Sequence, residues 1–191
     1  MSYPTPNIFY STAGAPPYIP DDETPTDTNE PYLDWLNFVM SQKTISQTIS
    51  TSYGDDEQTV PKSYAVRVCN MIGMMGLRGI SILESSGDTG VGAPCKSNDG
   101  KNTTQFTPTF PGTCPYIISV GGTQAVTPEV AWVAGSGGFS NYFSRPAYQD
   151  LAVGTYLSSH ISPATKKYYE PYTNFAGRGF PDISAHSLTP E

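Results

Sequence analysis

The chain has 191 residues, of which 37% are hydrophobic and only 14% are charged. This length is sufficient for one globular domain with a sizeable core, and the composition excludes a wholly disordered chain. The formal net charge of -7 at pH 7 argues against a nucleic-acid-binding surface. No stretch approaches the ~20 apolar residues of a membrane span, and no signal peptide is visible at the start. The acidic composition suits a protein that works in acid, where protonated carboxylates bring the charge toward zero.

The first half of the chain predicts a strand–helix–strand unit, and therefore a parallel sheet with a right-handed crossover. Apolar residues at helical spacing, and short apolar runs with β-branched residues, mark its elements. A short strand is expected at residues 8–10 and an acidic loop at 21–30. An amphipathic helix follows at 30–42, with Asn29 as its N-cap. The strand–helix–strand unit itself is predicted at 48–52, from Pro61 to Gly79, and at 80–85.

The strand at 80–85 delivers a glycine-rich loop, Gly87–Gly92, that carries Asp88. Open α/β sheets bind ligands at the carboxyl ends of their strands, so Asp88 is a candidate functional carboxylate. The alternative is that Asp88 only closes a turn, as Asp often does. A dinucleotide site is excluded because the spacing is GxxGxG and no helix follows at Ala93-Pro94.

The second half predicts fewer regular elements. A long polar loop is expected at 93–113, a buried strand at 116–120 and a glycine-rich loop at 135–138, where a second backbone could approach closely. The remaining elements are a helix from Arg145-Pro146 to about Ser158, a loop over 161–181 and a short strand at 180–184.

The three cysteines suggest one disulfide and no metal site. Cys95 and Cys114 lie in polar, Pro-rich loops, and a bond between them would close a loop of about 20 residues, stabilising the fold by about 3 kcal/mol. Cys69 lies in an apolar helical pattern and is expected to be a free, buried thiol. No CxxC motif or His/Cys cluster is present. Asn102 begins the sequon Asn102-Thr103-Thr104, which is consistent with glycosylation and secretion.

Six segments resemble the sedolisin family, the serine-carboxyl peptidases of subtilisin-like fold, and most closely its fungal tripeptidyl-peptidase branch. They occur in family order across nearly the whole chain: 29–36 (NEPYLDWL), 50–57 (STSYGDDE), 85–92 (SSGDTGVG), 110–123 (FPGTCPYIISVGGT), 137–149 (GGFSNYFSRPAYQ) and 177–185 (GRGFPDISA). The resemblance implies an α/β fold, a three-layer parallel sheet flanked by helices, here incomplete.

The resemblance also implies which catalytic group this segment holds. The family uses a Ser nucleophile, a Glu base supported by an Asp, and a second Asp at the oxyanion hole, which matches Asp88. The Glu/Asp helix, the nucleophile and the calcium loop of the family match no residue of this chain. Glu30, Asp34 and Asp182 fall elsewhere in the pattern and are not substitutes. Residues 1–191 therefore correspond to the central part of one peptidase domain, expected to be inactive alone, with calcium expected only for the full domain.

The resemblance further implies a substrate cleft. Ser52, Tyr53 and Gly54 would line it at a strand end, with Gly137 and Gly138 in the opposite wall, so that an extended peptide pairs between them. Gly54 could instead only form a turn, and the glycine run could be a flexible loop. The expected partner is a peptide or unfolded protein, bound by a secreted monomer at acid pH and cleaved internally or by removal of tripeptides. A non-catalytic peptide-binding relative is the alternative.

Overall fold

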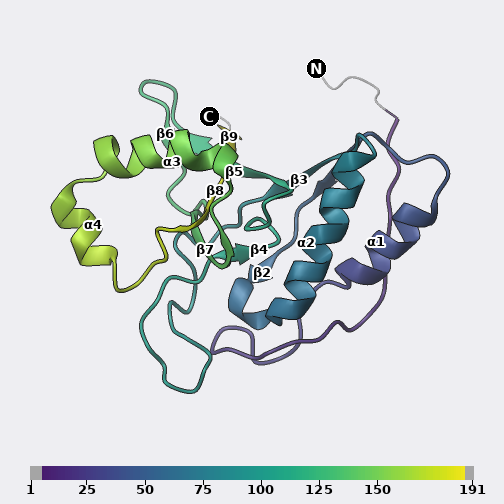
Figure 1. Ribbon diagram of the computed structural model, residues 1–191, viewed down its shortest axis with the longest axis horizontal. Helices are drawn as coiled ribbons and strands as arrows, with labels where there is room; N and C mark the ends of the chain where they lie inside the picture. The colour runs from purple at the N-terminus through teal and green to yellow at the C-terminus, as the bar shows by residue number, and fades with distance from the viewer. Residues whose placement is uncertain (1–5, 188–191) are drawn as a thin grey trace.

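The computed structural model describes residues 6–187 as an α/β fold around a five-stranded sheet (Figure 1). The sheet order is β1-β3-β5-β6, with β9 also pairing with β5, and β1, β3, β5 and β9 run parallel. Their bounds are β1 Thr48–Thr51, β3 Ser81–Ser85, β5 Ile118–Gln124, β6 Val130–Ala131 and β9 Ile183–His186. The predicted strand–helix–strand unit is thus confirmed.

Two helices, α1 (Tyr32–Ser41) and α2 (Lys62–Leu77), pack with one face of this sheet to form the core. The α2 helix buries Val68, Cys69, Ile72 and Met75 at helical spacing. The sheet contributes Ile49 and Ile82, which are neighbours in the β1–β3 register. Inward and outward side chains alternate along β3, and this alternation fixes which face is covered.

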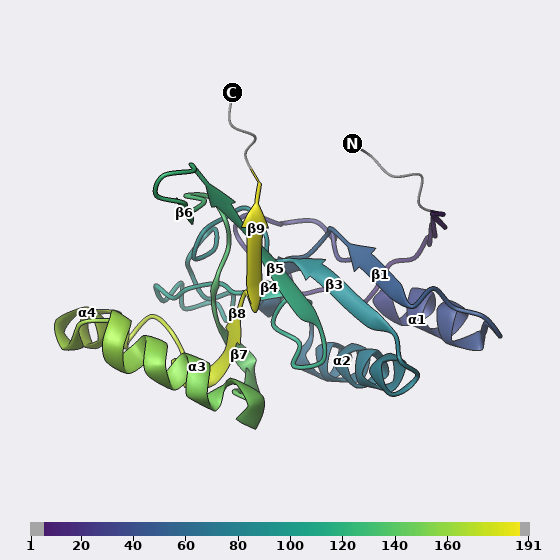
Figure 2. The same cartoon turned by 90° about the horizontal axis from the view of Figure 1, so that it is seen from above.

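The opposite face of the sheet is left open by the described residues. Figure 2 shows α2 below the strands and no helix above them. Thr48, Ser50 and Ser81 point away from the core and are exposed, and so is Ile183 of β9. The predicted α/β class with helices beside a parallel sheet is confirmed, and residues 6–187 supply helices on one face of it.

The C-terminal part adds a second small sheet and two helices. Strand β7 (Gly138–Ser144) pairs antiparallel with β8 (Gly177–Phe180), and a further short pair joins β2 (Asp55–Asp56) to β4 (Thr109–Phe110). The helical segment predicted from Arg145 begins with a 3-10 turn at Ala147–Gln149. It continues as α3 (Asp150–Thr155) and ends in a π-helical turn at Tyr156–His160.

Helix α4 (Pro163–Tyr169) lies where the sequence predicted only loop. Its start has an ordinary signal: the Ser162 hydroxyl accepts the Thr165 N–H at 3.0 Å, and Pro163 occupies the first turn. The prediction that Asn29 caps α1 is wrong. Asn29 instead exchanges side-chain hydrogen bonds with Thr59, and no strand forms at residues 8–10.

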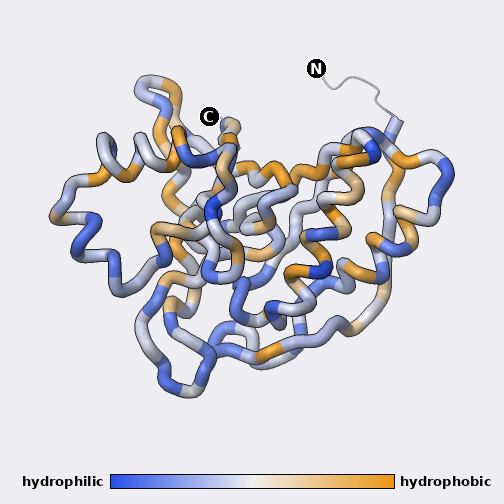
Figure 3. Tube along the Cα trace, viewed as in Figure 1, coloured by the Kyte–Doolittle hydropathy of each residue, from blue (hydrophilic) through white to orange (hydrophobic). Residues whose placement is uncertain are grey.

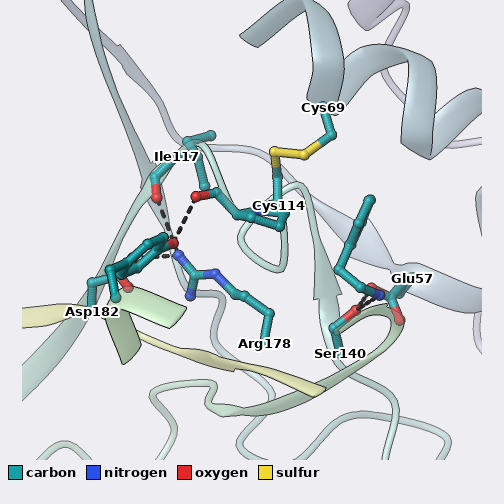
Figure 4. The surroundings of a disulfide bond; sticks show 10 residues. Glu57, Cys69, Cys114, Ile117, Ser140, Arg178 and Asp182 are labelled. Atoms are coloured by element: carbon teal, nitrogen blue, oxygen red, sulfur yellow. Dashed lines mark hydrogen bonds and ion pairs between the residues drawn. A yellow bond between two sulfur atoms is a disulfide. The ribbon is translucent and has the colours of Figure 1, made fainter. Parts of the chain in front are cut away.

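The predicted disulfide between Cys95 and Cys114 is wrong. Cys114 is bonded to Cys69, with 5.6 Å between their Cα atoms, and Cys95 is free (Figure 4). Cys114 lies in a turn that is packed against α2 and is fully buried, as is Cys69. The polar, Pro-rich composition around Cys114 suggested an exposed loop, whereas its side chain faces the helix that carries Cys69.

An ion pair of the buried Arg178 fixes the turn between β8 and β9 to β5. The Arg178 guanidinium is fully buried and contacts Asp182, and it also donates to the Ile117 carbonyl (Figure 4). Asp182 accepts the Ser119 N–H at 2.8 Å as well. A buried charge needs such a partner, so Asp182 has a structural role, in keeping with its exclusion from the catalytic candidates.

Candidate functional site at the carboxyl edge of the sheet

The loop that follows β3 presents Asp88 to solvent. Asp88 is exposed, and its carboxylate has no hydrogen-bond partner among residues 6–187. The flanking Gly87 and Gly90 adopt φ values of +104° and +62°, which other residues rarely adopt. The glycines therefore allow the sharp turn that leaves Asp88 projecting from the strand end.

The glycine-rich segment before β7 lies directly against this loop. Four backbone or side-chain hydrogen bonds join the two, all between 2.8 and 3.1 Å: Ser136 N to Gly87 O, Gly137 N to Gly90 O, Gly90 N to Ala134 O and Thr89 N to Ser136 Oγ. The structure therefore brings Gly137 and Gly138 together with Asp88, on the same side of the site.

Ser52, Tyr53 and Gly54 follow the neighbouring strand β1. Because Thr51 pairs with Glu84 in a parallel register, the ends of β1 and β3 lie at one edge of the sheet. The Tyr32 hydroxyl donates to the Tyr53 carbonyl at 2.6 Å. The predicted cleft residues and the predicted oxyanion-hole residue are thus placed at the same edge.

The backbone of this segment has one free side. Strand β1 lies at the end of the sheet order, so one of its edges is unpaired. The backbone N–H and C=O groups of Ser52 and Gly54, just beyond this strand, form no hydrogen bond within the part of the chain that the structure describes. An added peptide strand could pair there.

A buried carboxyl, Glu84, lies beneath the Tyr53 segment. It is 1% exposed, accepts a hydrogen bond from the Thr51 hydroxyl, and its Oε1 has no partner within the described residues. Burial raises the pKa of Glu84 to about 8, and the nearby Thr51 hydroxyl and Tyr53 N–H oppose that rise. Burial, with Glu84 nearby, also raises the pKa of Tyr32 well above its ordinary value. Both side chains are therefore neutral in acid.

Two further carboxyls follow Gly54 directly. Burial, with Asp21 close by, raises the pKa of Asp56 to about 8. Burial also raises the pKa of Asp55, against the effect of a hydrogen bond from Thr28. The raised pKa values of Glu84, Asp55 and Asp56 thus favour their protonated forms, which suits a site that operates in acid.

A buried serine–carboxyl pair joins Ser140 to Glu57, but it is not placed for catalysis. The Ser140 hydroxyl donates to Glu57, whose carboxylate also accepts the backbone N–H groups of Asn141 and Tyr142. Ser140 is fully buried and Glu57 is 1% exposed, so no substrate reaches either of them (Figure 4). The pair instead fixes the irregular stretch of β7 between Phe139 and Ser144.

Comparison with known proteins identifies the family. Tripeptidyl-peptidase sed4 of Aspergillus fumigatus is 62% identical over 195 residues, which cover 100% of this chain and 33% of that protein. The chain belongs to the sedolisin family. A probable tripeptidyl-peptidase SED4 of Arthroderma benhamiae is 48% identical over 95% of this chain and 30% of its own length. The chain therefore spans about a third of the length of the curated relatives that it matches.

Other comparisons add less. Tripeptidyl-peptidase SED2 of Arthroderma otae is 43% identical over 97% of this chain and 31% of its own length. A solved Pseudomonas sedolisin, a serine-carboxyl proteinase complexed with two molecules of pseudo-iodotyrostatin, covers 78% of this chain and 40% of its own, with 23% identity and a TM-score of 0.48. No family model matches the chain.

The sequence located the loops of this candidate site but not their supports. Tyr32, Glu84 and Ser136 were missed as site residues. Glu84 carried a usable signal, because it falls at an inward position of β3, two residues after the buried Ile82. The roles of Tyr32 and Ser136 depend on contacts between segments far apart in sequence, which no local pattern reveals.

Proposed function

We propose that the protein to which this segment belongs is a serine-carboxyl peptidase that acts on peptides in acid and removes tripeptides. The observation that carries the proposal is the exposed Asp88 carboxyl beside the unpaired edge at Ser52 and Gly54. The relatives named as tripeptidyl-peptidases support it across this whole segment.

In this proposal Asp88 stabilises the oxyanion of the tetrahedral intermediate. A protonated carboxyl donates a hydrogen bond to developing negative charge, whereas an ionised one repels it. The substrate backbone pairs with Ser52 and Gly54, while Tyr53 is held from below by Tyr32. The nucleophile and the general base come from outside the described residues, so the 191-residue chain alone is expected to hydrolyse no peptide.

Three further parts of the proposal concern the whole protein. Asn102 is exposed in the polar loop around residues 96–104, which is hydrophilic over most of its length in Figure 3, and this accessibility supports glycosylation and secretion. No helix among residues 6–187 is long and apolar enough to cross a membrane. Those residues contain no group of three or more His, Cys, Asp or Glu side chains suited to a metal, so none is assigned to calcium.

The test uses a hybrid in which these 191 residues replace the matching third of the Aspergillus fumigatus tripeptidyl-peptidase. Asp88→Ala removes the donor and is expected to lower kcat by roughly 10² to 10³ at acid pH. Asp88→Asn keeps a donor of nearly the same shape and should retain more activity. An unchanged kcat in a folded Asp88→Ala hybrid would make Asp88 a turn residue. A folded hybrid that binds peptides but cleaves none would favour a peptide-binding relative.

A further inference from the structure

The backbone on both sides of Asp88 is held by a single residue, Ser136. The Ser136 N–H donates to the Gly87 carbonyl at 2.8 Å, and the Ser136 hydroxyl oxygen accepts the Thr89 N–H at 2.9 Å. The same hydroxyl lies 3.2 Å from the Thr89 hydroxyl. The peptide group before Asp88 and the one after it are therefore anchored to one serine.

The contact is partly buried and tightly packed. Ser136 is 3% exposed. A Cβ atom added to Gly87 would lie 2.9 Å from the Ser136 hydroxyl oxygen, so the two segments approach as closely as a glycine permits. Removing the hydroxyl would leave the Thr89 N–H without its partner in the protein.

Asp88 itself has no side-chain anchor within residues 6–187. The loop backbone therefore determines where Asp88 projects, and the contacts to Ser136 fix the peptide groups on both sides of Asp88. We propose that Ser136 is a positioning residue of the peptidase site, whose hydroxyl aims the Asp88 carboxyl at the oxyanion. This inference rests on the proposed function, in which Asp88 acts as the oxyanion donor.

The first test measures kinetics in the hybrid protein described above. Ser136→Ala keeps the backbone N–H and removes only the hydroxyl. We expect kcat to fall about 10-fold to 100-fold, because small misplacements of a catalytic group have effects of this size, while KM changes less than about twofold. Ser119→Ala is the matched control: Ser119 is equally buried, but its hydroxyl has no partner within the described residues, so kcat should be unchanged.

A double-mutant cycle separates positioning from general stability. If Ser136 acts through Asp88, Ser136→Ala in an Asp88→Ala background should lower kcat by less than about twofold. Equal losses of kcat in both backgrounds would overturn the proposal, and so would an unchanged kcat in the single variant. A normal kcat in Asp88→Ala would instead contradict the proposed function.

Amide hydrogen exchange at Thr89 tests the contact without any activity. In the folded hybrid, Ser136→Ala should raise the exchange rate of the Thr89 amide at least about 10-fold, with the amides of α2 unchanged. Equal Thr89 exchange rates in the two proteins would overturn the role of the hydroxyl. This measurement decides the matter even for a hybrid that cleaves no peptide.

Discussion

The two loops of the candidate site lie at one edge of the sheet but are held by different chemistry. The Asp88 loop is fixed by backbone hydrogen bonds and by the Ser136 hydroxyl, none of which titrates in the working range of a protein. The Ser52–Gly54 segment is supported by Tyr32 and Glu84, and Glu84 does titrate. The comparison indicates that pH acts on the Ser52–Gly54 segment more than on the geometry of the Asp88 loop.

The direction in which pH changes stability follows from the direction of the Glu84 pKa shift. The pKa of Glu84 rises from about 4.5 in an unfolded chain to about 8 in the fold, so the folded state holds its proton more tightly. Its contribution to stability is fully present below about pH 4.5 and is lost as the pH rises through about 8. Asp56, with a pKa of about 8, acts in the same direction.

The largest expected effect on stability comes from the disulfide, which serves as a pH-independent reference. Cys69 and Cys114 are separated by 45 residues, and in the chain-entropy account such a bond stabilises by about 4 kcal/mol. Replacing both by Ala should therefore lower the unfolding midpoint of the hybrid by a similar amount at pH 5 and at pH 8. A loss confined to one pH would show that the bond acts through a titrating group.

Removing the titration of Glu84 should give the next largest effect. Glu84→Gln keeps the shape but cannot ionise, so the fall in unfolding free energy between pH 5 and pH 8 should shrink by a few kcal/mol. Asp56→Asn is the matched comparison and should remove a second part of the same slope. The measurement is denaturant unfolding of the hybrid at both pH values. An undiminished slope in both variants would mean that neither carboxyl stabilises the acid form.

The smallest effect should come from Tyr32→Phe, which removes the hydrogen bond to the Tyr53 carbonyl. A single neutral hydrogen bond contributes about 1 kcal/mol, so KM for a peptide substrate should rise severalfold with kcat nearly unchanged. Ser136→Ala is expected to lower kcat and to leave KM nearly unchanged. If both variants changed the same kinetic constant, the division between a pairing segment and an oxyanion loop would not hold.

The elements that the sequence predicted well are those with local signals. The period of α2, the apolar run of β3 and the glycines around Asp88 each reflect constraints within a few residues. The predicted disulfide was wrong because burial of Cys114 depends on α2, which lies far away in the sequence. Helix α4 had a local cap at Ser162, but the Tyr-rich segment around it suggested loop.

The candidate site shows the same difference between local signals and contacts over long sequence distances. Asp88 and the Ser52–Gly54 segment could be located from motifs, because each lies in a short conspicuous stretch. Their supports could not, since the contact between Ser136 and Thr89 spans 47 residues. A single sequence does not show which hydroxyl contacts an amide that is far away in the chain.

The most direct test of the account is a crystal structure of the hybrid, at acid pH, with a peptide aldehyde bound as a mimic of the tetrahedral intermediate. We predict an Asp88 carboxyl oxygen within about 3 Å of the oxygen derived from the aldehyde. The peptide backbone should pair with Ser52 and Gly54, and the Tyr53 carbonyl should keep its bond to Tyr32. A peptide bound away from this edge, or an Asp88 carboxyl turned away from that oxygen, would contradict the account.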